Sequence, residues 1–515
     1  MKKKYITIIL SAVFVLGMTS CNDWLDVEQN TERQANKMFD NYDGFKGALA
    51  GCYSDLVKTD LYGTRLTMSN VDAMACLWYM DETKTYKSSI LDNFYFRNHD
   101  YTNTNSEASI RAIYSAFYNT ILEANMVIKG AQEKGNNIEN PKSRALVEGE
   151  AYAIRALCQF DILRLFGQVP VNPTILVSLP YSEVTSLDEE AVYYPFDQYV
   201  EKLKADLEKA KALMKDNDPV FDYTYKELNM AGTKDYEHVS VEDEFFLSRQ
   251  YRMNYWAVRA LEARMYMYLG QKQLAHDIAM EVINAKTKND KKVVELSSYA
   301  DYGTGDLSLY SSPSECLFCL YMSKLRDVST GILCGGDAQG ENIMRVDPEY
   351  HLVLSETWLT NLFAGCNTAT DIRFLKMWSK TATVSGFVWP TIRKYYSKEA
   401  KDNSGVTPLC EIPVIRLSEM YLIAMEGASS LEEANTLYAT YMESKGVSRR
   451  NYFDSMDKVK AELPNEYRRE FFAEGQMFYY YKRNKSARMW SKENVEVRES
   501  EYILPLPNTE YNPNK

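Results

Sequence analysis

The chain has 515 residues, 45% of them hydrophobic, and a formal net charge of −12 at pH 7. This hydrophobic content excludes an intrinsically disordered chain, and the length exceeds one ordinary core, so we expect two subdomains or a helical array. The acidic balance argues against nucleic-acid binding, which needs clustered Lys and Arg side chains to neutralise phosphates.

The first 20 residues have the pattern of a secretory signal. Lys2 to Lys4 precede an uncharged run of 12 residues, Tyr5 to Leu16, and small or polar residues then lead to Cys21. The apolar run is too short to span a bilayer, which needs roughly 20 apolar residues, and no later segment comes close. We therefore expect residues 1–20 to be a signal peptide and the chain to be exported.

The end of this signal resembles a bacterial lipobox, where the chain is cut before a cysteine that carries lipid. It reads Met18-Thr19-Ser20-Cys21. Two or more acyl chains hold a protein on a membrane stably, because each buried CH₂ group contributes ~0.8 kcal/mol. We expect lipidation at Cys21; the alternative is a secreted protein with an incidental cysteine. Loss of the three signal lysines changes the formal charge from −12 to −15.

A long helix is predicted after Pro141. Apolar side chains recur at helical spacing over residues 146–163, and Gly167 stops the pattern. An antiparallel partner helix is expected to begin near Pro195. The two segments together predict a helical hairpin.

A second hairpin is predicted around Gly270. Large apolar residues and alanines recur at helical spacing from Trp256 to Met267, and the pattern resumes from Ala275 to Ile283. Alanines at a helix crossing, with a glycine turn between the helices, are typical of closely packed tetratricopeptide-like pairs.

A third hairpin begins at Leu417 and restarts at Ser430. The sequence from Ser430 to Glu433 predicts a capping box, and Lys445-Gly446 predicts the end of the helix. The three hairpins do not recur at the strict period of about 34 residues that regular tetratricopeptide arrays have. We therefore predict a mainly α protein with a degenerate, tetratricopeptide-like scaffold.

Long turn-rich stretches separate the hairpins. Loops of this length inside a compact protein are usually functional or contain minor structure of their own. A ligand site is expected in them, because loops on a rigid scaffold commonly carry binding residues. They cover roughly residues 60–105, 213–250, 288–350 and 365–412.

The remaining cysteines and the four scattered histidines suggest no metal or redox site. Cys316-x-x-Cys319 lies in an apolar, strand-like run without a second cysteine pair, and zinc would need two further ligands. We expect buried thiols, no metal and no cofactor, although an oxidising compartment would permit disulfides. The other cysteines are Cys52, Cys76, Cys158, Cys334, Cys366 and Cys410.

Seven segments in order, from Cys21 to the last ten residues, form a recognisable set. They are Cys21 to Val27, Gly47 to Tyr53, Tyr114 to Asn125, Glu148 to Pro170, Pro413 to Leu422, Glu466 to Gly475 and Ile503 to Pro507. Together they resemble the SusD/RagB family of nutrient-binding outer-membrane lipoproteins. The segment from Tyr114 is similar to an aromatic-rich family helix that ends in Ala-Asn. Aromatic residues fill Phe478 to Tyr481, where the family commonly has Asp-Leu.

The resemblance implies an α/α superhelix with an irregular, loop-rich ligand-binding part. It implies an N-terminal SusD-like domain over residues 21–220 and a C-terminal RagB/SusD domain over residues 221–515. Family members cap a SusC-like TonB-dependent transporter as a hinged lid and trap glycans or oligopeptides. A surface-exposed, lipid-anchored position on the outer membrane is implied too, and the acidic residues Asp23, Asp26 and Glu28 after the lipidated cysteine fit surface export.

The ligand-binding residues are expected among the aromatic side chains of the irregular stretches. The chain has 39 Tyr, 20 Phe and 7 Trp, and rigid aromatic planes stack on the apolar faces of sugar rings at little entropic cost. Trp78 and Tyr79 resemble an aromatic loop of starch-binding family members, and Tyr350 and Trp389 lie in later irregular stretches. The alternative for each ring is local packing.

An enzyme is the main rival interpretation. A glycoside hydrolase needs two carboxyl groups roughly 5 to 10 Å apart, but the sequence singles out no pair among its 71 acidic residues. Gly-x-Ser-x-Gly, His-Glu-x-x-His and phosphate-loop patterns are absent from the sequence. We therefore predict a non-catalytic protein that captures a glycan for a transporter. Capture of an oligopeptide stays open, as does a structural or adhesive role.

Overall fold

The computed structural model describes residues 37–186, 188–228, 239–298, 313–334, 346–379, 389–395, 410–449, 451–492 and 494–510. The predicted signal, the lipidation site Cys21 and the acidic residues that follow it lie outside these ranges.

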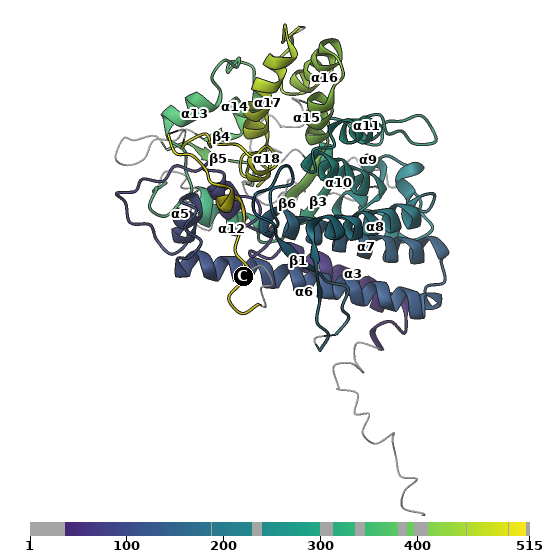
Figure 1. Ribbon diagram of the computed structural model, residues 1–515. Coiled ribbons are helices and arrows are strands. Elements are labelled where there is room, and N and C mark those ends of the chain that lie inside the picture. Colours follow the sequence, from purple (N-terminus) through teal and green to yellow (C-terminus); the bar gives the residue numbers. More distant parts are fainter. Residues whose placement is uncertain are drawn as a thin grey trace, which may run out of the picture.

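Packed α-helices form the body of the protein, as predicted. From α3 to α16 each long helix contacts the next in the series, and α17 contacts α15, so the chain builds a continuous helical array (Figure 1). In Figure 1, α6 runs along one side of the molecule and α15, α16 and α17 stand at the opposite end. The long helices are α3 (Tyr42–Leu56), α6 (Thr104–Lys134), α7 (Pro141–Phe166), α8 (Phe196–Met214), α10 (Tyr255–Tyr268), α11 (Lys272–Ile283), α15 (Leu417–Gly427), α16 (Leu431–Ser444) and α17 (Met456–Phe471).

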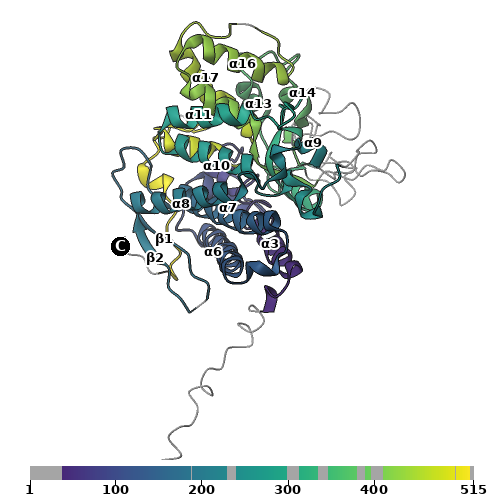
Figure 2. The ribbon, with the colours of Figure 1, turned by 90° about the vertical axis from the view of Figure 1, so that its right-hand side faces the viewer.

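Short helices and strands occupy the stretches between the hairpins. The short helices are α4 (Asn70–Met74), α5 (Leu91–Arg97), α9 (Tyr225–Leu228), α12 (Leu325–Ser329), α13 (Glu356–Leu362), α14 (Ile372–Lys376) and α18 (Met477–Arg483). The strands form three antiparallel pairs: β1 (Ser178–Tyr181) with β2 (Val192–Pro195), β3 (Cys316–Tyr321) with β6 (Glu411–Arg416), and β4 (Trp378–Ser379) with β5 (Thr391–Ile392). The β1 and β2 hairpin, which the sequence reading missed, projects beside α8 (Figure 2).

The first predicted hairpin is confirmed, with α7 and α8 packed together. Asn140 caps α7 by accepting hydrogen bonds from the backbone of Lys142 and Ser143, and proline occupies the first turn, where a missing N–H costs nothing. At the other end, the buried Lys482 ammonium donates to the carbonyls of Arg164 at 2.8 Å and Gly167 at 2.6 Å. Both ends of α7 are therefore satisfied by side chains.

The helix α6 is longer than the resemblance suggested. It continues to Lys134, so Ala124 and Asn125 lie within the helix and do not end it. The buried Asn125 amide donates to the carbonyls of Ser182 and Val184 and accepts from Arg155. This asparagine therefore fastens the loop after β1 to the helix.

The second hairpin, α10 and α11, is confirmed, and Gly270 adopts the positive φ of +77° that its turn requires. The third, α15 and α16, is also confirmed, and it ends at Gly446 with φ +81°. The predicted capping box is half wrong. Ser430 accepts from the backbone of Glu433, but the Glu433 carboxylate accepts from Ser429 instead of from the Ser430 N–H.

The apolar run of Cys316 and Cys319 forms β3, and both side chains are buried, as expected. Cys366 is only half-buried. Within the described ranges, no His, Cys, Asp and Glu side chains gather into a group that could hold a metal ion. No helix of the described part is long and apolar enough to cross a membrane.

The predicted domain boundary at residue 220 falls in a single 3₁₀ turn, Pro219–Phe221. Buried Arg249 crosses this boundary, because it pairs with Asp218 at 2.8 Å and with Glu150 of α7 at 2.5 Å. The division into residues 21–220 and 221–515 stays a prediction.

Candidate ligand-binding face

Three of the four predicted ligand-binding residues lie on one part of the surface, which we call the aromatic face: Tyr79, Tyr350 and Trp389. The rings of Tyr79 and Trp389 are 5.0 Å apart between centroids and inclined by 41°, and both side chains are half-buried. Tyr350 is 45% exposed, with the Lys87 ammonium 5.5 Å from its ring centroid. Partly open rings of this kind can stack on a ligand without moving.

Backbone hydrogen bonds bring the three rings together from distant parts of the sequence. The Tyr79 N–H donates to the Val353 carbonyl at 2.9 Å, and the Lys87 N–H donates to Glu349 at 2.9 Å. The Leu354 N–H donates to the Pro390 carbonyl at 3.0 Å. The segments around residues 79–90, 346–354 and 389–395 therefore form one connected surface.

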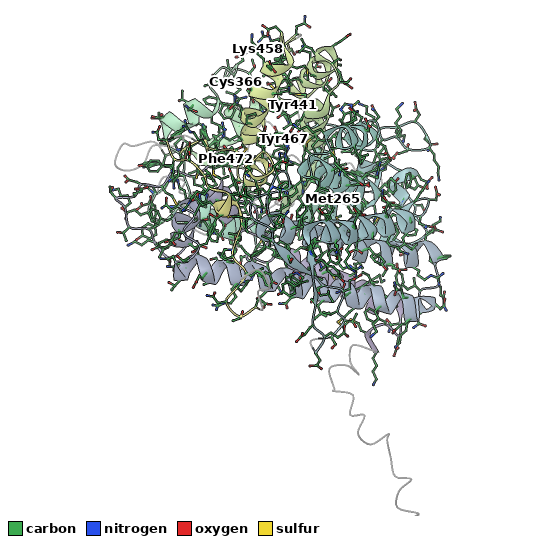
Figure 3. All side chains as sticks on the ribbon, viewed as in Figure 1. Met265, Cys366, Tyr441, Lys458, Tyr467 and Phe472 are labelled. Carbon is green, nitrogen blue, oxygen red and sulfur yellow. The ribbon has the colours of Figure 1, made fainter. Side chains whose placement is uncertain are left out.

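Trp78 lies beneath this surface and not on it. Its side chain is completely buried, with the ring edge-on to Phe472 at 4.9 Å and 87°; Phe472, labelled in Figure 3, caps the end of α17. The indole N–H has no hydrogen-bond partner in the described structure. The position favours the packing alternative for Trp78, because side chains alternate along the extended Trp78-Tyr79 segment and only Tyr79 turns outward.

A tight turn after α17, which includes Ala473 and Gly475, forms hydrogen bonds with the segments that carry the aromatic face. The buried Asp72 carboxylate accepts from the backbone of Ala473 at 2.5 Å and of Gly475 at 3.1 Å. Gly475 has φ +69°, and a Cβ there would lie 1.8 Å from the Leu66 carbonyl, so only glycine fits. Asp72 thereby ties the helix that precedes Tyr79 to this turn.

The same turn also holds the segment of Trp389. The buried Lys394 ammonium donates to the Glu470 carbonyl and to the Glu474 carboxylate, both at 2.5 Å, and the Tyr395 hydroxyl donates to Ala473 at 2.7 Å. Burial lowers the pKa of Lys394. The sequence alone did not predict the roles of Asp72 and Lys394, because their partners lie about 400 and 80 residues away.

A buried ionic network surrounds the turn. Arg416 pairs with Glu315 at 2.5 Å and with Glu470 at 2.6 Å, while Arg373 pairs with Glu466 at 2.6 Å. Burial alone would raise the pKa of Glu466, but the neighbouring arginines outweigh burial and hold the pKa at about 2. Such a network is costly to break, since removing one partner leaves a buried charge unpaired.

The polar groups around the aromatic face suit a hydroxyl-rich ligand. The Asp81 carboxylate accepts from the backbone and hydroxyl of Thr83, and these bonds hold its pKa below the ordinary value. Burial raises the pKa of Tyr79. Its phenol hydroxyl can both donate and accept hydrogen bonds. The aromatic face thus offers stacking planes beside hydrogen-bonding groups.

A SusD-like family model, described as starch-binding associating with outer membrane, matches residues 23–267. This match includes Tyr79 but not Tyr350 or Trp389. No curated protein sequence matches the chain at a significant level.

Solved structures resemble the chain over most of its length. A SusD superfamily protein from Bacteroides thetaiotaomicron is 21% identical with a TM-score of 0.65, covering 92% of this chain and 98% of that one. Surface glycan-binding protein A from Bacteroides uniformis is 17% identical with a TM-score of 0.63, covering 90% and 93%. A laminarin-binding SusD-like protein is 16% identical with a TM-score of 0.57, covering 91% and 96%.

Proposed function

We propose that this SusD-like chain captures a glycan on the aromatic face. A SusD-like family model matches residues 23–267, and a solved SusD superfamily structure shares the fold over about nine-tenths of the chain. The paired rings of Tyr79 and Trp389 carry this proposal. Two half-open rings 5.0 Å apart, backed by a buried network, present a rigid stacking surface. Rigid surfaces lose little entropy on binding.

The similar proteins support the ligand class. The family model is described as starch-binding, and the names of two similar structures specify glycan and laminarin binding. Sugar rings bind aromatic planes through their C–H faces and use their hydroxyls for hydrogen bonds to groups such as Asp81 and Tyr79. A glycan therefore suits the face better than a fully apolar ligand.

The protein is proposed to act at the outer membrane as a non-catalytic partner of a SusC-like TonB-dependent transporter. The lipobox-like sequence at Cys21 supports a lipid anchor, and the family description supports association with the outer membrane. In this role the aromatic face holds an oligosaccharide and releases it unchanged to the transporter.

Affinity electrophoresis in gels containing amylopectin, laminarin or xylan tests the proposal. At least one glycan should retard the protein, and Tyr79→Ala should weaken that binding by ~1 to 3 kcal/mol, the scale of aromatic truncations at binding sites. Tyr266→Ala is the matched control, because Tyr266 is another half-buried tyrosine, on α10. If Tyr79→Ala is retarded by the glycan as strongly as the unchanged chain, the proposed binding site is contradicted. Binding of a peptide library without any glycan would favour oligopeptide capture instead.

A further inference from the structure

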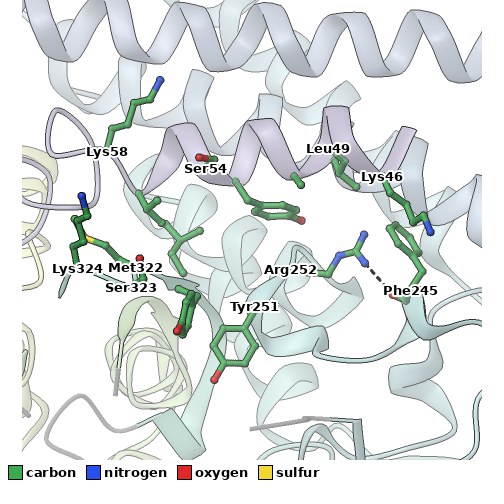
Figure 4. Close-up of a pocket in the computed structure, with 15 residues that line it drawn as sticks. Lys46, Leu49, Ser54, Lys58, Phe245, Tyr251, Arg252, Met322, Ser323 and Lys324 are labelled. Atoms are coloured by element: carbon green, nitrogen blue, oxygen red, sulfur yellow. Dashed lines mark hydrogen bonds between the residues drawn. The ribbon is translucent and has the colours of Figure 1, made fainter. Parts of the chain in front are cut away.

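A pocket lies between α3 and the end of β3, and its lining includes none of the three rings of the aromatic face. Its volume is about 910 Å³. One wall is the α3 face that includes Leu49, Tyr53 and Val57, and the opposite wall is formed by Leu320 to Lys324. In Figure 4, Lys58 and Lys324 lie toward one end of the pocket, and Lys46 and Arg252 lie toward the other.

The charge of the pocket lining is opposite to that of the chain. Four cationic side chains line it, Lys46, Lys58, Arg252 and Lys324, whereas none of its lining residues is an aspartate or glutamate. The whole chain carries a net charge of −12. A cationic lining inside an acidic protein attracts anions selectively, because the rest of the surface repels them.

Two cations of the rim, Lys46 and Lys324, can turn to a ligand at little cost. Lys46 pairs with Asp43 at 2.8 Å and Lys58 with Asp55 at 2.5 Å, each within one turn of α3. The Lys46 pair is exposed and contributes only ~0 to 1 kcal/mol, so a bound anion can replace it, whereas the largely buried Asp55 carboxylate holds Lys58 more firmly. Lys324 forms no ion pair with any residue of the described structure.

The fourth cation is fixed in place. Three contacts hold the Arg252 guanidinium in one position. It pairs with Glu150 at 3.0 Å, donates to the Phe245 carbonyl at 2.9 Å and lies 3.4 Å from the Phe245 ring centroid. The dashed line in Figure 4 marks its bond to Phe245. A preorganised guanidinium binds a carboxylate or sulfate with little loss of side-chain entropy.

Apolar and aromatic surface completes the pocket. Tyr321 is 54% exposed, and its ring stands edge-on to Tyr251 with centroids 6.5 Å apart. Leu49 and Val57 supply aliphatic surface from α3. The occupant that fits is therefore a ring with one apolar face and an anionic group.

We propose that this pocket is a second binding site, for a sugar residue that carries a carboxylate or sulfate. The ring would lie against Tyr321, with its anionic group near Lys324, while Arg252, toward the other end of the pocket, would hold the anionic group of a neighbouring sugar residue. The choice of a sugar rests on the proposed glycan-binding function; the preference for an anion rests on the pocket alone.

An acidic peptide fits the pocket less well. Peptides commonly bind by adding a strand to a free sheet edge. One edge of β3 is paired with β6, and at the start of the strand the Cys316 and Leu317 carbonyls already accept from Gln250 at 2.7 Å and Asn254 at 2.9 Å, so an added strand could not pair along the whole of β3.

The test compares oligogalacturonate and dextran sulfate with neutral dextran and poly-L-glutamate, using the detergent-purified full chain and calorimetry at low salt. At least one anionic glycan should bind more tightly than dextran. Lys324→Glu should weaken this binding about tenfold or more, the scale of a lost charge-assisted hydrogen bond. Lys460→Glu, an exposed lysine on α17, is the matched control and should leave binding unchanged.

Tyr321→Ala is a second test variant, which leaves the charge of the pocket unchanged. It should also weaken binding of the anionic glycan. The proposal is overturned if neither anionic glycan binds more tightly than dextran, if Lys324→Glu and Lys460→Glu behave alike, or if poly-L-glutamate alone binds at the pocket. Neutral-glycan binding that depends on Tyr79 reports separately on the aromatic face, so failure of either proposal is recognised without the other.

Discussion

Replacement of Trp78 by alanine tests whether this side chain, beneath the aromatic face, contributes to packing or to ligand contact. The indole is completely buried against Phe472, and its N–H has no hydrogen-bond partner in the described structure. The substitution therefore removes packing without leaving a polar partner behind. Loss of a buried aromatic side chain typically costs about 3 to 5 kcal/mol, because the cavity closes only in part. We expect Trp78→Ala to lower the free energy of unfolding by this amount.

Denaturant unfolding and calorimetry on the same preparations provide the measurement. Trp78→Phe is the matched control, since it keeps an aromatic ring and loses no hydrogen bond, and it should cost clearly less than the alanine variant. The folded fraction of Trp78→Ala should bind glycan with an affinity close to that of the unchanged chain. Wild-type stability combined with lost binding would refute this reasoning and return Trp78 to the ligand site.

Three further outcomes are expected. Cys21→Ala should move the protein from membranes to the soluble fraction, and continued palmitate incorporation would place the anchor elsewhere. A glycan that the protein binds should remain intact after long incubation; steady turnover that survives repurification and is lost with one carboxylate substitution would show an enzyme. The pKa of Glu466 is held at about 2, below its ordinary value of 4.5, so the stability from its ion pairs should be present above pH 4.5 and lost as pH falls toward 2. Glu466→Gln should reduce this acid dependence in denaturant titrations, and an unchanged slope would contradict it.

Local signals explain why the helical scaffold was predictable. The hairpins at Pro141, Gly270 and Leu417 are marked by capping residues, glycine turns and apolar periodicity within a few residues of each helix end. The capping box, which was only half correct, shows the limit of such signals. The N–H groups of Ser429 and Ser430 are neighbours in the chain, and the Glu433 carboxylate accepts from that of Ser429. Sequence spacing could not decide between them.

The aromatic face depends on long-range contacts that no local pattern encodes. Tyr79 meets Trp389 across 310 positions of the chain, and Asp72 reaches a turn about 400 residues away. The exposure of Trp78 and Tyr79 is decided by what packs beneath them, chiefly Phe472. Residue types alone could not decide which ring of the pair faces outward, because tertiary packing determines it.

A crystal structure of the chain with a bound oligosaccharide would show directly where the glycan binds. We expect a sugar ring to stack on Tyr79 or Trp389, with Trp78 still buried beneath them. A glycan bound elsewhere, with both of these rings free of ligand, would contradict it.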